Sequence, residues 1–168
     1  MAPEAPSRVF GIDPGSRSTG WAVVERSGGR YRALAAGAIR THAELPMGQR
    51  LLEIHAGLTA LLTTWAPSAA ALEQIFAYRS ATSALVLGQA RGVALLAVAE
   101  HGVPLYEYNA STIKKSVTGS GRAEKDQMTR MVALLLGAPL SPHDAADAAA
   151  IAITHYAHAA SFRLVASR

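Results

Sequence analysis

Short apolar runs bounded by turn residues predict strands along the chain. Each run is four to ten residues long and carries few charges, as half-buried and buried strands do. The turn residues Ser27-Gly28-Gly29-Arg30 separate the second run from the third and therefore predict a hairpin. The expected strands are Arg8–Ile12, Gly20–Arg26, Tyr31–Arg40, Ala69–Leu72 and Val103–Tyr108.

Helical spacing of apolar residues predicts helices between and after these strands. In residues 47–65, leucine and isoleucine recur three and four positions apart, and Pro67 follows. Thr118–Gly121 is rich in glycine and serine and predicts a loop. The expected helices are Met47–Trp65, Ser80–His101, Ala110–Val117, Glu124–Leu136 and Ser141–Ala160.

This order of elements predicts one α/β domain, a mixed sheet with helices packed on it. The chain has 168 residues, half of them apolar, which is near the usual size of one domain. No internal repeat or linker divides it, so we expect a single domain over residues 1–168. Residues 1–7 contain two prolines and are expected to form a flexible tail.

Composition narrows the possible chemistry. The absence of cysteine excludes disulfides, thiolate metal sites and a cysteine nucleophile. The N-terminus lacks the apolar segment of a signal peptide, and apolar runs such as Val93–Ala99 are too short to span a membrane. We therefore expect a cytoplasmic protein with no membrane partner.

Charge mildly favours a polyanionic partner, because the net charge is +4. Basic residues gather between Tyr108 and Met131, where only Glu124 and Asp126 oppose them. This run is either a solvated surface or a phosphate-binding patch. Its members are Lys114, Lys115, Arg122, Lys125 and Arg130.

Four acids have apolar or tightly turned neighbours. Asp13 and Glu73 come at the ends of expected strands, and Asp144 and Asp147 are three residues apart on one face of an expected helix. Burying an isolated carboxylate is costly, and no basic residue stands beside any of the four in the sequence. A divalent cation would balance them, and hard oxygen ligands select magnesium or manganese. Two such ions can share a phosphodiester oxygen, so the pattern predicts phosphodiester chemistry if the helix crosses the strand ends.

Three of these acids also have purely structural interpretations. Asp13 precedes Pro-Gly and could form a turn. Glu73 could pair with an arginine, and Asp147 could be a buried acid with a partner.

Asp144 has the strongest structural alternative. Ser141 resembles an N-cap, Pro142 suits the first helical position, and Asp144 then falls at the acidic position of a capping box. His143 is either a ligand or proton carrier beside Asp144, or an exposed histidine of the first turn.

Five segments, in this order, resemble the RuvC family of bacterial Holliday-junction resolvases. The resemblance runs from about Val9 to His155 and implies a ribonuclease-H-like fold, with a mixed five-stranded sheet flanked by helices. It also implies that the four acids named above form a two-metal site. The segments are Gly11–Trp21, Leu72–Phe76, Ser83–Ala94, Ala123–Lys125 and Asp144–His155.

The resemblance implies a magnesium-dependent endonuclease that acts as a homodimer on four-way junction DNA in recombination and repair. Such enzymes cut two strands of like polarity and leave nicks with 5′-phosphate and 3′-hydroxyl ends. Two Mg²⁺ ions per subunit are implied, with Mn²⁺ as a substitute, and so is a branch-migration helicase partner. In some relatives a histidine replaces the acid matched by Asp144, so His143 stays a possible ligand.

The resemblance also assigns DNA contacts. Phe76 matches an aromatic residue that stacks on a base near the junction centre, although an aromatic residue after a strand could equally lie in the core. Lys114 and Lys125 match basic residues near the scissile phosphate. Lys115 and Arg122 are further candidates from the basic run.

The segment Ser80–His101 is apolar on more than one face, whereas a surface helix shows one apolar stripe. Gly88 and Gly92 are four residues apart and would permit close approach of another backbone. The helix is either fully buried in one core or forms a subunit interface, and the resemblance implies the interface. A two-fold dimer suits a substrate with its own two-fold symmetry.

Three other classes share some of these features. An actin-like ATPase or sugar kinase opens with a similar strand, loop and hairpin, but it needs a second domain and a second phosphate loop. A non-catalytic junction-binding protein would not need the acids. A shorter, resolvase-like family that acts in RNA processing would differ in its substrate.

Overall fold

The computed structural model describes the backbone of residues 7–74 and 80–166, and the side chains through residue 159. The strands are β1 (Ser7–Asp13), β2 (Ser18–Ser27), β3 (Arg30–Arg40), β4 (Ala69–Gln74) and β5 (Leu105–Asn109). The helices are α1 (Met47–Trp65), α2 (Ala81–Glu100), α3 (Ala110–Thr118), α4 (Lys125–Leu136) and α5 (His143–Ala166).

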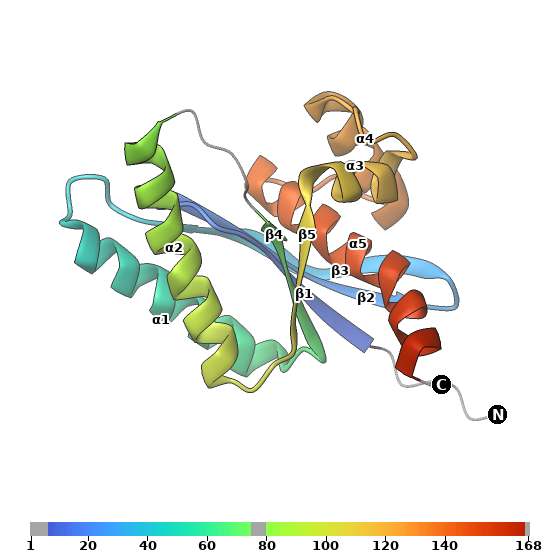
Figure 1. Ribbon diagram of the computed structural model, residues 1–168, viewed down its shortest axis with the longest axis horizontal. Helices are drawn as coiled ribbons and strands as arrows, with labels where there is room; N and C mark the ends of the chain where they lie inside the picture. The colour runs from blue at the N-terminus through green and yellow to red at the C-terminus, as the bar shows by residue number, and fades with distance from the viewer. Residues whose placement is uncertain (1–6, 75–79, 167–168) are drawn as a thin grey trace.

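The strands form one mixed sheet in the order β3-β2-β1-β4-β5. β2 runs antiparallel to β1 and β3, whereas β4 runs parallel to β1 and β5. α1 and α2 cover one face of the sheet, and α3, α4 and α5 cover the other (Figure 1). The expected fold class, a mixed five-stranded sheet flanked by helices, is confirmed.

The β2–β3 hairpin turns at Gly28 and Gly29, where the sequence predicts it. Both glycines have positive φ, 55° and 80°. A two-residue hairpin turn of this kind needs the left-handed conformation at both central positions, which glycine adopts without steric cost.

Two glycines let α5 lie very close to the sheet. A Cβ atom at Gly11 would come within 2.0 Å of the Ala148 carbonyl oxygen, and one at Gly20 within 2.1 Å of the Asp144 carbonyl oxygen. The buried residues of the first turns of α5, between Asp144 and Ile151, are all alanine except Ile151 itself. This close packing fixes the first turns of α5 over the ends of β1 and β2.

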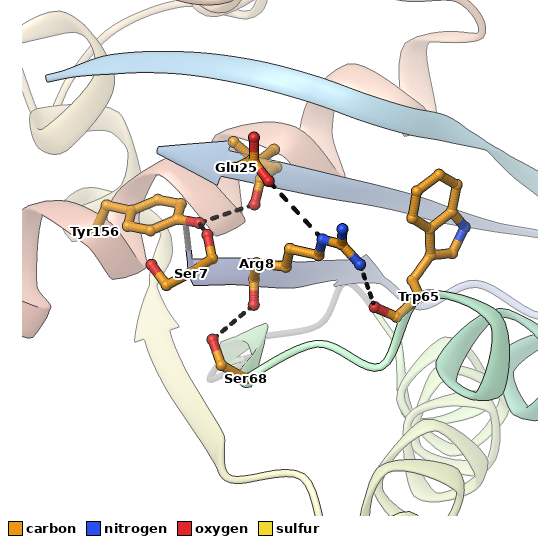
Figure 2. Close-up of polar contacts among 7 residues, drawn as sticks. Ser7, Arg8, Glu25, Trp65, Ser68 and Tyr156 are labelled. Carbon is orange, nitrogen blue, oxygen red and sulfur yellow. Dashed lines mark hydrogen bonds and ion pairs between the residues drawn. The ribbon is translucent and has the colours of Figure 1, made fainter. Parts of the chain in front are cut away.

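Polar contacts fix the beginning of β1, at the opposite end of the strand (Figure 2). The Tyr156 hydroxyl of α5 lies 2.5 Å from the Ser7 carbonyl oxygen and 2.8 Å from that of Val24. Arg8 pairs with Glu25 and donates to the Trp65 carbonyl oxygen. Both ends of β1 are therefore held against neighbouring elements.

Most expected bounds are right to within two residues, but the N-terminal cap of α5 was wrongly predicted. The helix begins at His143, so Ser141 is not its N-cap and Pro142 is not its first residue. It also continues to Ala166, six residues beyond the expected end. The first six residues of the expected tail and Phe76 lie outside the described residues, whereas Ser7 belongs to β1.

The sequence left open whether α2 is fully buried in one core or forms a subunit interface, and in the structure α2 is not fully buried. It buries a face of small residues against the sheet, and it leaves Leu85 and Leu96 65% and 52% exposed on the opposite face. The helix has 20 residues and a mean hydropathy of 1.5, so by length and composition alone it could cross a membrane, contrary to the expectation from run length. Here its Arg91 forms an ion pair with Glu107 of β5, which ties the helix to the sheet.

A buried polar cluster joins β5 to α5. The Tyr108 hydroxyl lies 2.9 Å from Nδ1 of His155, and both residues are 7% exposed. Burial lowers the pKa of His155, and the nearby His158 lowers it further. The hydroxyl can donate to Nδ1 only when this nitrogen carries no proton, which agrees with a neutral imidazole.

The contribution of His155 to the free energy of unfolding should therefore fall at acidic pH. Because the pKa of His155 is lower in the folded than in the unfolded protein, its contribution is complete above about pH 6.5, the unfolded value, and is lost as the pH falls below it. Urea unfolding between pH 7.5 and 5 would measure how the free energy of unfolding changes with pH. As the pH falls, His155→Gln should become more stable relative to the wild type, whereas His42→Gln, at an exposed site, should keep a constant difference from it. Equal changes with pH for the wild type and His155→Gln would contradict this expectation.

Candidate active site

Three carboxylates converge where α5 crosses the end of β1. Oxygen atoms of Asp13, Asp144 and Asp147 all lie within 4.8 Å of one another. Asp13 is the last residue of β1, and Asp144 and Asp147 share one face of the first turns of α5. The expectation that strand-end and helix acids would meet is confirmed for these three.

Glu73 joins this cluster from the neighbouring strand. Ile12 of β1 pairs with Leu72 of β4, so the next residues along these parallel strands, Asp13 and Glu73, lie side by side at the same end of the sheet. Strand β4 continues one residue further, to Gln74. A pocket of about 260 Å³ opens here, and Asp13, Glu73, Lys114, Lys125 and Asp147 contribute to its lining.

Burial and like charge make this cluster electrostatically unfavourable. Desolvation, helped by Asp147, Glu73 and Asp144, raises the pKa of Asp13 to about 7. Desolvation and Asp147 also raise the pKa of Glu73. Carboxylates in this situation need a cation to remain ionised together near neutral pH.

Two lysines supply part of that positive charge, which corrects the expectation that no basic residue lies beside the acids. Lys125 Nζ is 3.4 Å from the nearer carboxylate oxygen of Asp147, and Lys114 opposes the upward pKa shift of Glu73. Both side chains come from elements distant in sequence from the acids they approach. The remaining excess of negative charge and the oxygen-only donor set fit a hard divalent cation such as Mg²⁺.

Asp144 does not cap its own helix. The Ser18 hydroxyl at the start of β2 donates to Asp144 Oδ2 over 2.5 Å. His143 is exposed and stands outside the group of three converging carboxylates. The geometry thus favours Asp144 over His143 as the side chain that faces the site.

Arg50 supports the loop that follows Asp13, a role that the sequence did not reveal. This α1 residue is 9% exposed and donates to the Ser16 carbonyl oxygen, to the Ser16 hydroxyl and to the Thr41 hydroxyl. The sequence did not reveal the role of Ser18 either. Its partner Asp144 is 126 residues away, and no local pattern marks such a contact.

The other expected DNA contacts are less closely tied to the acids. Lys115 and Arg122 are not among the residues that line the pocket. Phe76 follows Glu73 by three residues, but it lies outside the described part of the chain.

Asp13→Asn should stabilise the metal-free protein at pH 8, because the neutral amide removes a buried like charge. The upper limit is roughly 4 kcal/mol, since the pKa is raised from 3.8 to about 7 and each unit corresponds to about 1.4 kcal/mol. Thermal unfolding in chelator would measure this gain. Added Mg²⁺ should stabilise the wild type and leave Asp13→Asn nearly unchanged.

Asp126→Asn is a suitable control, because Asp126 is an exposed acid of α4. It should respond to chelator and Mg²⁺ as the wild type does. If Asp13→Asn were less stable than the wild type in chelator, the carboxylates would not be in electrostatic conflict.

The strand order and the acids at the centre of the sheet define a ribonuclease-H-like nuclease domain. The family model described as crossover junction endodeoxyribonuclease RuvC matches residues 9–155. The chain therefore belongs to the RuvC family.

Individual relatives agree with this assignment. The chain is 49% identical over 150 residues to the RuvC protein of Chloroflexus aggregans, covering 88% of this chain and 92% of the relative. It is 50% identical over 149 residues to that of Hahella chejuensis, covering 88% and 86%. The structure of Thermus thermophilus RuvC in complex with a Holliday junction substrate is also similar. That match has a TM-score of 0.86 and 36% identity and covers 92% of this chain and 97% of the other.

Proposed function

We propose that this protein is a magnesium-dependent endonuclease that resolves Holliday junctions in DNA recombination and repair. The observation that carries this proposal is the convergence of three carboxylates over the end of β1 in a chain of the RuvC family. With this activity, the protein would act on DNA in the cytoplasm. A branch-migration helicase complex is a further expected partner.

Two metal ions per subunit would be held by Asp13, Glu73, Asp144 and Asp147, with His143 as an alternative to Asp144. When bound, Mg²⁺ lowers the pKa of water and stabilises the charge that develops on the phosphodiester; Mn²⁺ would substitute. The raised pKa values of Asp13 and Glu73 support this assignment, because they indicate acids whose charge the protein itself does not balance.

The chain's own residues would orient the substrate. Hydrolysis that leaves a 5′-phosphate and a 3′-hydroxyl breaks the bond between phosphorus and O3′, and the acids would position the phosphate only through the metal ions that they would hold. Lys114 and Lys125 would hold the backbone beside the scissile phosphate, because both line the pocket. Lys115 and Arg122 would contact phosphates further away, and Phe76 would stack on a base near the junction centre.

Asp147→Asn should separate cutting from binding. Loss of one carboxylate should slow junction cutting by at least about a hundredfold, as loss of other transition-state contacts does. Junction affinity should persist or rise, because one charge that repels phosphate is gone. A synthetic four-way junction with Mg²⁺, with cuts mapped on gels, measures both. Glu100→Gln, at the C-terminal end of α2, is the control and should cut normally.

The same assay distinguishes the remaining alternatives. Asp144→Asn should lose activity and His143→Asn should keep it; the reverse result would move the ligand role to His143. Precursor ribosomal RNA should remain intact. Cutting of that RNA, but not of junctions, would assign the protein to RNA processing.

We also propose a two-fold homodimer built on α2. Leu85, Gly88, Gly92 and Leu96 recur three or four residues apart and form one stripe along this helix, with both leucines exposed. A Cβ atom at Gly88 or Gly92 would meet no atom within 4 Å in the described part of a single protomer. The stripe therefore combines exposed apolar side chains with room for a second backbone, which supports close contact between two copies of α2.

Gly88→Leu should weaken the dimer without unfolding the protomer. Overpacking at a close interface costs about 1–3 kcal/mol, so the dimer dissociation constant should rise roughly tenfold or more. Sedimentation at several protein concentrations would measure this constant. Single nicks should replace paired cuts, because each protomer carries one carboxylate cluster.

Gly48→Leu is the matched control, since a Cβ atom at Gly48 of α1 would also meet no atom within 4 Å among the described residues. It should leave the dimer intact. A fully active Gly88→Leu dimer would place the interface elsewhere.

A further inference from the structure

The carboxylate cluster has a second basic side, formed by the end of β3. Arg40, the last residue of β3, pairs with Ser18, and paired residues of antiparallel strands point to the same face of the sheet. Ser18 donates to Asp144, so this face carries the acids. The neighbouring Ile39 packs against α1 at Gly57, on the opposite face, which agrees with the placement of Arg40.

The guanidinium of Arg40 is available to a ligand. Arg40 is exposed, and its side chain makes no hydrogen bond or ion pair with any group in the described part of the chain. Arg17, also exposed, lies beside it, because the Thr41 amide donates to the Arg17 carbonyl oxygen. Two acids outside the cluster lie near the end of β3: Glu44 is exposed in the turn that follows the strand, and Glu53 of α1 contacts His42.

The position of β3 in the sheet places Arg40 opposite Lys114. β3 and β5 are the two edge strands, and β1, with Asp13, lies midway between them. α3, which carries Lys114, begins directly after β5. At about 4.8 Å per strand, the two edges are roughly 19 Å apart, a span of about five to six nucleotides at about 3.4 Å rise each.

A DNA strand that crosses the carboxylates meets negative charge at the centre of this span. Positive charge on only one side would anchor the strand at one end, whereas positive charge on both sides would hold it across the site. Arginine suits this purpose, because its planar guanidinium donates two parallel hydrogen bonds to a phosphate. We propose that Arg40 binds a backbone phosphate of the cleaved strand, on the side of the carboxylates opposite Lys114. This inference rests on the proposed junction-cutting function.

Salt dependence of junction binding tests the contact. Loss of one phosphate contact makes the slope of log affinity against log salt shallower by about one. For Arg40→Ala in chelator, each protomer of the proposed dimer loses one contact, so the rise in Kd between 50 and 200 mM salt should be about sixteenfold smaller than for the wild type. Arg32→Ala is the control, because Arg32 is an arginine near the other end of β3 and should keep the wild-type slope.

Arg40→Lys keeps the charge and should restore the slope, and Arg40→Gln is a second neutral variant should Arg40→Ala fold poorly. An Arg40→Ala or Arg40→Gln slope equal to that of the wild type overturns the inference. If the wild-type protein binds no junction, the proposed function is overturned as well. If the wild type binds and cuts junctions normally and the slope of the variant is unchanged, only the role of Arg40 is overturned.

Neutral methylphosphonates at single backbone positions of the junction test the side of the contact. A replacement at one position should weaken junction binding by the wild type but not by Arg40→Ala, because that variant has already lost the contact. A replacement at a second position should weaken junction binding by the wild type but not by Lys114→Ala. The two positions should lie on opposite sides of the scissile phosphate. Positions on the same side would overturn the inference.

Discussion

The close approach of α5 to the sheet is the constraint on which the site depends. Gly11 and Gly20 leave no room for a side chain beneath the helix, and alanines form the buried side of its first turns. The helix therefore lies where Asp144 and Asp147 reach the end of β1. A larger residue at either glycine would move two carboxylates away from Asp13, and the site would lose its geometry before any acid was changed.

This packing places several negative charges where water cannot fully solvate them. The pKa of Asp13 is raised to about 7, and Lys125 balances Asp147 only in part. The metal-free site is thus a source of instability, and the proposed ions would relieve it. Binding of the metal, and not the fold alone, would keep the acids ionised together at the pH at which the enzyme acts.

Local sequence patterns predict those features that depend on local geometry. The turn at Gly28 and Gly29, the spacing of Asp144 and Asp147 and the strand that ends at Asp13 could all be read in this way. The sequence left a capping role for Asp144 open, and the structure instead shows Ser18 of a distant strand donating to its carboxylate. The pair between Lys125 and Asp147 was also missed, since only the packing of α4 on α5 brings the two together.

The acids at the end of β1 are proposed to bind the metal ions that support cutting. Anomalous scattering from crystals soaked in Mn²⁺ tests this claim most directly. Manganese peaks are expected between Asp13, Glu73, Asp144 and Asp147, and they should be lost in crystals of Asp13→Asn. Manganese bound elsewhere, with none at these carboxylates in a protein that cuts junctions in Mn²⁺, would contradict it.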